Sequence, residues 1–176
     1  MKQLNELDRF RSAWETEAER ILQVLQALPQ DQYDFRPDPK GRSLGELAWH
    51  LSEVDACLTF GISVGRFLFE DEPPDLMRPR EVKLLAPGYR RIHEQAVDRL
   101  RILEQDRLDD VVTYFDGREM TLREVLWDRL LHHLIHHRAQ LVLLCRMAGG
   151  TPPGLYGPNR EEMQALRERM AAGQSG

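Results

Sequence analysis

The sequence predicts an all-α fold, in which a four-helix bundle carries a short β-hairpin between its third and fourth helices and a further helix at the C-terminus. Two observations support this prediction. Apolar residues recur at three- and four-residue steps along four long segments, which is the period of an amphipathic helix. The connections between these segments are rich in proline and glycine and too short for the crossovers of a parallel sheet. We expect residues 1–176 to form a single domain, and a looser five-helix array is the alternative.

The first two helices have clear start and stop signals. The first is expected over residues 5–28, because one apolar stripe runs through this segment and Pro29 ends it. A proline-rich loop follows. Ser43 and Glu46 then have the spacing of a capping box, in which each side chain bonds the backbone of the other residue. The second helix is therefore expected to begin there and to run to about Phe69.

A third helix and a hairpin are expected next. The proline-rich linker 70–80 leads to a helix over residues 82–104. Proline is tolerated only in the first turn of a helix, so the alternative is that this helix begins at Pro87 or later. The β-prone segment 111–115 is followed by Asp116-Gly117, and together they predict a short hairpin.

The fourth helix begins with a second capping box. Thr121 and Glu124 have the required spacing, and the helix is expected over residues 122–148, where a glycine pair ends it. A final polar helix is expected over residues 159–172, with Asn159 as its N-cap.

Composition limits the classes of function. Hydrophobic residues make up 41% of the chain and charged residues 30%, which fits a globular protein, and the net charge is −5. An acidic chain without a basic stripe is not expected to bind nucleic acid. No apolar run approaches the roughly 20 residues of a membrane span, and the N-terminus lacks the apolar core of a secretory signal. We therefore expect a cytoplasmic protein with no membrane partner, in which Cys57 and Cys145 are reduced thiols.

Four of the chain's six histidines fall within residues 132–137, inside the fourth helix. An α-helix turns about 100° per residue, so the apolar residues of this helix define its inward face. His133 and His137 fall in the middle of that face, whereas His132 and His136 lie roughly 80–100° to one side. The histidines thus form two i, i+4 pairs, and one pair is expected to point toward the core.

The inward pair is expected to bind a divalent metal ion. Two imidazoles four residues apart have a spacing suited to one cation, and two unpartnered buried imidazoles would each lose hydrogen bonds to water, at about 1–3 kcal/mol per group. His50, on the edge of the apolar stripe of the second helix, is the candidate third ligand. Three neutral imidazoles suit Zn²⁺ or Ni²⁺ and leave a position open for water or a thiol.

Other interpretations of these histidines remain open. His50 could be a core histidine bonded to a backbone carbonyl, and His93 is expected at the surface or the boundary of the core. His132 and His136 are expected to flank the site, but would be the ligands if the helix were rotated. The zinc-protease motif is rejected because His133 stands where that motif has its glutamate. A ferritin-like di-iron site is rejected because the nearby carboxylates of the helix face away.

Two segments resemble the DinB/YfiT-like family of metal-binding four-helix bundles, which includes bacillithiol- and mycothiol-dependent enzymes. They are residues 43–51 (SLGELAWHL) and 133–141 (HLIHHRAQL). The resemblance implies a metal held by one histidine of the second helix and an i, i+4 pair of the fourth, which are His50, His133 and His137 in this sequence. Ala139 replaces a glycine that is frequent in the family, a small-for-small change. Characterised relatives use a low-molecular-weight thiol in S-transfer or in maleylpyruvate isomerisation.

Three hypotheses follow for the function. The first is a metal-dependent thiol S-transferase that joins a low-molecular-weight thiol to a small electrophilic substrate; it is favoured because no protein general base is expected beside the histidines. The second is a metal-dependent hydrolase or isomerase, and the third is a non-catalytic metal-binding bundle. A homodimer is also expected, both from the resemblance and from second apolar stripes on the second and fourth helices, although packing within the chain could cover these stripes. The stripe residues are Trp49, Phe60, Phe67, Leu131, Ile135 and Val142.

Overall fold

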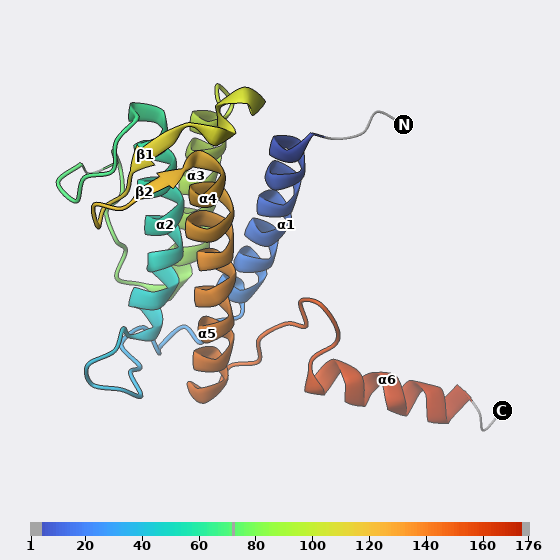
Figure 1. Cartoon of the computed structure of the whole chain (residues 1–176). Helices are drawn as coiled ribbons and strands as arrows, with labels where there is room; N and C mark the ends of the chain where they lie inside the picture. The colour runs from blue at the N-terminus through green and yellow to red at the C-terminus, as the bar shows by residue number, and fades with distance from the viewer. Residues whose placement is uncertain (1–4, 72, 174–176) are drawn as a thin grey trace.

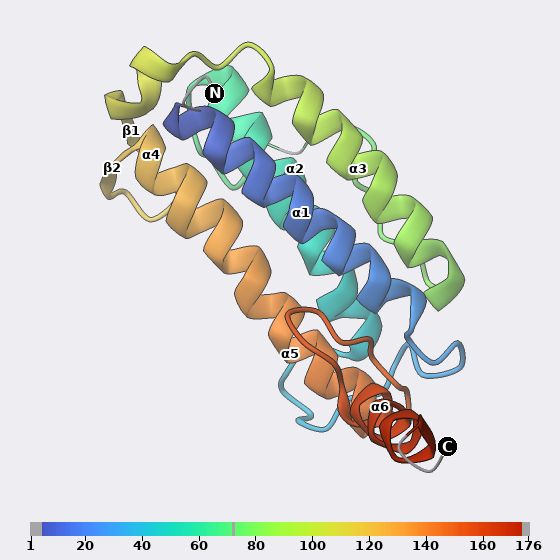
Figure 2. The same cartoon turned by 90° about the vertical axis from the view of Figure 1, so that its right-hand side faces the viewer.

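The computed structural model describes residues 5–71 and 73–173 and confirms the predicted helical bundle. Four long helical segments run side by side, and the last of them is a continuous rod made of α4, η3 and α5 (Figures 1 and 2). A two-stranded antiparallel hairpin connects α3 to this rod, and α6 extends away from the bundle. The bounds of the long elements are α1 Glu6–Gln26, α2 Leu44–Val64, α3 Leu85–Leu100, α4 Leu122–Glu124, η3 Val125–His132, α5 His133–Met147 and α6 Arg160–Gly173. The short elements are η1 Val82–Leu84, η2 Gln105–Asp109, β1 Val111–Thr113 and β2 Glu119–Thr121.

The predicted helix starts are confirmed by their caps. The side chain of Ser43 accepts a hydrogen bond from the backbone of Glu46, and the Glu46 carboxylate accepts one from the backbone of Ser43. Thr121 and Glu124 form the same reciprocal pair at the start of α4. Each box satisfies backbone donors that the first turn of a helix leaves without an intrahelical partner.

Helix α2 ends at Val64, earlier than the predicted end at Phe69. Gly65 adopts the left-handed conformation (φ 76°), which stops the helix at the position where glycine is favoured. The chain then folds back, so that the Phe67 ring packs on Gly61, where a Cβ atom would lie 2.4 Å from the ring. This early end leaves Phe69 outside the helix and 79% exposed.

The third helix is also shorter than predicted. The short turn η1 precedes α3, and Pro87 lies in the first turn of α3, where proline is tolerated. The helix ends at Leu100 rather than at residue 104, because tighter i to i+3 hydrogen bonds replace the helical pattern from Arg101 onward. The hairpin is confirmed: Val112 lies opposite Met120, and the turn residue Gly117 has φ 82°.

The rod of α4, η3 and α5 spans the predicted fourth helix, but its backbone is not α-helical throughout. Segment η3 is a π-helix, whose i to i+5 hydrogen bonds change the rotation per residue. The prediction that His133 and His137 lie in the middle of the buried face, made with a constant α-helical rotation, is therefore wrong. Leu134 and Arg138 occupy the centre of that face, and both histidines are half-buried at its edge.

Packing within the chain covers most of the second apolar stripes. Trp49, Phe67 and Leu131 are buried, Ile135 and Val142 are partly buried against the core, and Phe60 is partly exposed. The close contact of α3 with Trp49 depends on Gly88, where a Cβ atom would lie 2.7 Å from the indole ring.

Two further expectations concern the described residues. None of the described helices is both long enough and apolar enough to cross a membrane. Cys57 and Cys145 are not joined in a disulfide. The expectation of no secretory signal rests partly on residues 1–4, which lie outside the described residues.

Candidate metal centre

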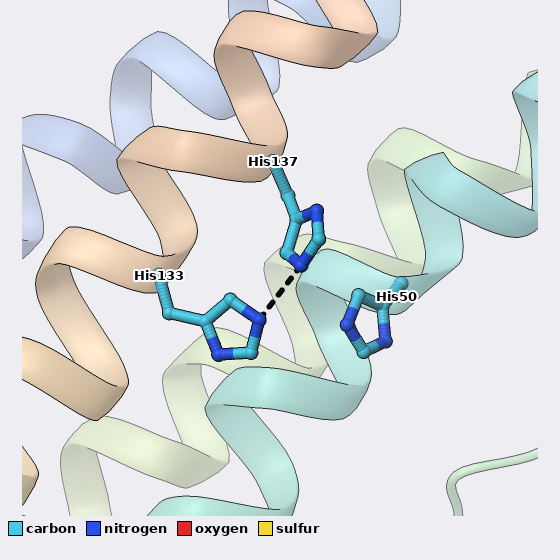
Figure 3. A group of neighbouring side chains, drawn as sticks. All are labelled: His50, His133 and His137. Atoms are coloured by element: carbon cyan, nitrogen blue, oxygen red, sulfur yellow. Dashed lines mark hydrogen bonds between the residues drawn. The ribbon is translucent and has the colours of Figure 1, made fainter.

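Three histidines from two helices meet between α2 and α5 (Figure 3). His50 projects from α2, and His133 and His137 project from successive turns of α5. One possible ligand atom from each side chain lies within 4.8 Å of the other two. Nε2 of His133 is 2.7 Å from Nε2 of His137. The fold thus brings together the three histidines that the sequence singles out.

Neighbours on the same helix hold two of these rings in place. Nδ1 of His50 lies 2.9 Å from Oε2 of Glu53, and Nδ1 of His137 lies 2.8 Å from Oε1 of Gln140. Carboxylate and amide oxygens accept hydrogen bonds, so Nδ1 carries the proton in each ring. The neutral tautomer then leaves the Nε2 lone pair unprotonated, which is the arrangement that orients a histidine toward a metal.

Burial keeps the α5 pair neutral. The pKa of His137 is lowered to about 4, chiefly by burial and also by repulsion from His50. The hydrogen bond with Gln140 acts in the opposite direction. Burial also lowers the pKa of His133, again with a contribution from His50. Both imidazoles are therefore neutral at pH 7. The two Nε2 atoms, 2.7 Å apart, can share a hydrogen bond donated by the Nε2–H tautomer of His133, or they can bind one cation together.

The donor set fits a divalent transition metal. Three neutral imidazole nitrogens suit Zn²⁺ and Ni²⁺, whereas hard cations such as Mg²⁺ prefer oxygen ligands. Neither carboxylate nor thiol completes a cluster of four among the described residues. A metal bound by these three side chains would therefore keep at least one coordination position for a water molecule or a substrate atom.

The flanking histidines lie outside this cluster. His132 is exposed and pairs with Asp128, at 3.1 Å between Nδ1 and Oδ1. His136 is also exposed, and its Nε2 lies 3.0 Å from the amide nitrogen of Gln140. His136 therefore contacts Gln140, the residue that orients His137, and is not a member of the cluster of three histidines.

His93 lies at the boundary of the core, as expected, and has a structural partner that the sequence did not indicate. Its Nδ1 is 2.8 Å from Oδ2 of Asp55, which is fully buried and also accepts a hydrogen bond from the indole of Trp14. The imidazole stacks on the Tyr89 ring. His93 thus links α3 to α2 and α1 and is not part of the histidine cluster.

A cavity of about 980 Å³ opens beside the histidines. His50, His133 and Glu53 form part of its wall. The rest of the wall comes from α2, from the loop between α2 and α3, and from the turn of the hairpin. The volume lies within the range of sites that bind small organic molecules, so a ligand in the cavity would lie next to the histidines.

Glu53 and Gln140 are the residues that sequence reasoning missed. The expectation that no general base lies beside the histidines is wrong, because the Glu53 carboxylate bonds His50 and lines the cavity. A signal was present: each of the two residues lies three positions after a histidine, on the same face of its helix.

Comparisons with known proteins agree with the fold and cover nearly the whole chain. The model of the DinB family matches residues 1–171. The uncharacterized protein YrdA of Bacillus subtilis (strain 168) is 29% identical over 156 residues, which are 89% of this chain and 91% of that protein.

Two solved structures are also similar. A DinB-like protein from Bacillus cereus ATCC 10987 is 30% identical, with a TM-score of 0.69 over 84% of this chain and 95% of that one. The DinB-like protein YjoA from Bacillus subtilis is 24% identical, with a TM-score of 0.65 over 86% and 99% of the two chains, and supports the fold alone. A family match over residues 1–171 is the decisive observation, and the chain therefore belongs to the DinB family.

Proposed function

We propose that His50, His133 and His137 bind one divalent metal ion, Zn²⁺ or Ni²⁺. The observation that carries this proposal is the convergence of their ring nitrogens within 4.8 Å, with the α5 pair held neutral by burial. Glu53 and Gln140 support it, because each fixes the tautomer of one ring.

We further propose that the protein is a metal-dependent thiol S-transferase, which joins a low-molecular-weight thiol to a small electrophilic substrate. A metal in this site would lower the pKa of a bound thiol and so supply a thiolate nucleophile. The adjacent cavity supports this reaction, because it gives an electrophile access to the side of the site formed by His50 and His133. Apolar side chains of α2 in the cavity wall, Val54 and Leu58, would exclude water from the reacting atoms.

A metal-dependent hydrolase or isomerase is the second candidate, and Glu53 favours it. The carboxylate of Glu53 is partly exposed at the cavity wall, within reach of His50. From this position it could accept a proton from a water molecule in the cavity, which is the role of a general base. Turnover without any added thiol would support this candidate over the transferase.

Metal analysis tests the site. Purified wild-type protein is expected to hold about one equivalent of Zn²⁺ or Ni²⁺ by mass spectrometry, and His137→Ala is expected to lose most of it. His132→Ala is the matched control, because His132 lies on the same helix but outside the cluster. Equal metal content in wild type and His137→Ala would contradict the assignment.

A kinetic assay tests the reaction. A panel of low-molecular-weight thiols is combined with a chromogenic aryl halide, and the rate is compared between metal-loaded and metal-stripped protein. The transferase proposal expects a thiol-dependent rate that falls to background when the metal is removed. A rate that is unchanged by stripping would exclude it, and stoichiometric metal without turnover would favour a non-catalytic bundle.

We also propose a cytoplasmic homodimer. Leu143 and Met147 on α5 and Met170 on α6 are more than half exposed, and apolar side chains of this size are commonly covered by a partner. The two cysteines without a disulfide fit a reducing compartment. Size-exclusion chromatography with light scattering decides the assembly: a mass near 20.5 kDa would exclude the dimer.

A further inference from the structure

The cavity beside the histidines has a wall of aromatic and aliphatic side chains. The early end of α2 at Gly65 places Phe69 next to the hairpin turn, where its ring centroid lies 5.0 Å from that of Phe115. The buried Phe67 ring packs against Phe115, with 5.5 Å between the ring centroids, and also contacts Tyr114. Two segments far apart in the sequence, residues 67–69 and 114–115, thus build one aromatic surface.

This surface is incompletely buried. Phe69 is 79% exposed and Met77 is 86% exposed, although both line the cavity. Exposed apolar side chains that surround a cavity mark a binding site, because a bound ligand would remove their surface from water. Aromatic rings at such a site favour flat ligands that can stack or pack edge-on.

The charged groups of the wall limit the ligand further. The wall contains carboxylates, from Glu53, Asp71 and Asp75, and neither lysine nor arginine among the described residues. Arg66 bonds the Asp71 carboxylate twice, and Glu53 bonds His50, so these two carboxylates already have partners. An anionic ligand would be buried against carboxylates without a cation to pair with, which is costly.

We propose that this cavity binds an uncharged, aromatic small molecule, and that it is the subsite for the electrophile. The second claim, that the cavity is the electrophile subsite, rests on the proposed function, because a metal held by the histidines beside the cavity would bind the thiol. Its first part does not require a metal, because the aromatic surface is built by the loop after α2 and by the hairpin turn, without the histidines.

A pair of dyes with related ring systems tests the ligand class in metal-stripped, full-length protein. N-phenyl-1-naphthylamine is uncharged, and 8-anilinonaphthalene-1-sulfonate adds one negative charge. Fluorescence titration is expected to give one site for the uncharged dye, with the sulfonate bound at least about tenfold more weakly. Equal affinity for the two dyes would overturn the inference.

Substitutions locate the dye. Phe69→Ala removes an exposed ring of the cavity and is expected to weaken binding of the uncharged dye about five- to tenfold, with an unchanged melting temperature. Ile102→Ala is the matched control, because Ile102 is 75% exposed and lies outside this cavity. Equal effects of the two substitutions would show non-specific adsorption and overturn the proposed site.

Failure of this inference is distinguishable from failure of the proposed function. Dye binding that is lost in Phe69→Ala, in a protein that holds no metal under any condition, would support the cavity and reject the metal site. A protein that holds stoichiometric metal but binds the uncharged dye no better than the sulfonate would support the metal site and reject the proposed cavity ligand. If the metal site and the cavity ligand are both confirmed, added Ni²⁺ is expected to quench the fluorescence of the bound dye in wild type and not in His137→Ala.

Discussion

His137 and Arg138 are neighbours on α5, yet they face different helices and have different environments. His137 points toward α2, where it meets two other histidines and remains half-buried (Figure 3). Arg138 points toward α1 and is 2% exposed, with its Nη2 atom 2.8 Å from Oε2 of Glu17. The hydroxyl of Tyr156 bridges this pair, because it accepts a hydrogen bond from Arg138 and donates one to Glu17.

The difference separates a structural polar cluster from a binding site. The Glu17 carboxylate compensates the charge of Arg138 within the chain, although Nε and Nη1 of Arg138 have no hydrogen-bond partner among the described residues. The α5 histidines, by contrast, face each other as neutral rings, and their convergent Nε2 atoms could ligate one cation. A buried charge that meets its counter-charge inside the chain contributes to the fold, whereas neutral metal-ligating groups that converge beside a cavity indicate a ligand.

The largest expected effect is on stability, at the structural cluster. Glu17→Gln leaves the buried Arg138 cation without its counter-charge, which is expected to lower the free energy of unfolding by about 3–5 kcal/mol. Urea denaturation measures this change, and Glu19→Gln, an exposed carboxylate on the same helix, is the control. The metal content per folded protein is expected to stay the same. Loss of metal in a folded Glu17→Gln protein would break the separation between the two clusters.

The second-largest expected effect is on metal affinity, at Glu53, which positions His50. Glu53→Ala removes the hydrogen-bond acceptor of His50 and is expected to weaken metal binding about 10- to 100-fold. The control is Asp128→Ala, which removes the same kind of carboxylate–histidine contact from His132 on the outer face. Competition with a chromogenic chelator measures both affinities. Equal affinities of the two variants would mean that Glu53 plays no part in positioning His50.

The histidine cluster was predictable because its signal is local. Two of its members are four residues apart on one helix, and a capping box fixes the start of the helix that carries His50. The structural cluster was not predictable in the same way. Glu17 and Arg138 lie far apart in the sequence, and a charged residue in a helical pattern is normally assigned to the surface.

The errors in a helix face and in a helix end both arise where local backbone geometry departs from the regular α-helix. Face analysis assumes a constant rotation per residue, and the π-helical segment η3 breaks this assumption just before His133. The same applies to the end of α2, where the backbone of Gly65 overrides the apolar pattern that continues to Phe69. The three histidines of the candidate site were predicted from the sequence, while the cavity beside them, whose wall includes Phe69 in the loop after Gly65, was not.

The smallest expected effect is the pH dependence of the metal-free protein, and it sharpens the contrast at His137. Its folded pKa is about 4, below the ordinary value of 6.5, because burial disfavours the charged ring. Between these values the unfolded chain binds more protons than the folded one, so stability is full above pH 6.5 and falls as the pH decreases toward 4. The full shift corresponds to about 3 kcal/mol, and solvent screening of a half-buried ring reduces the expected loss to about 1 kcal/mol.

The difference between two variants isolates this contribution from the carboxylates that titrate in the same range. Metal-free His137→Gln is expected to lose less stability than wild type between pH 6.5 and pH 4.5, because its side chain takes up no proton on unfolding. His132→Gln, which changes an exposed histidine of the same helix, is expected to follow wild type. Urea denaturation at several pH values in the presence of a chelator gives the comparison. If His137→Gln and wild type lose the same stability, the ring is not held neutral by the fold, and the chemical distinction between His137 and Arg138 would have to be abandoned.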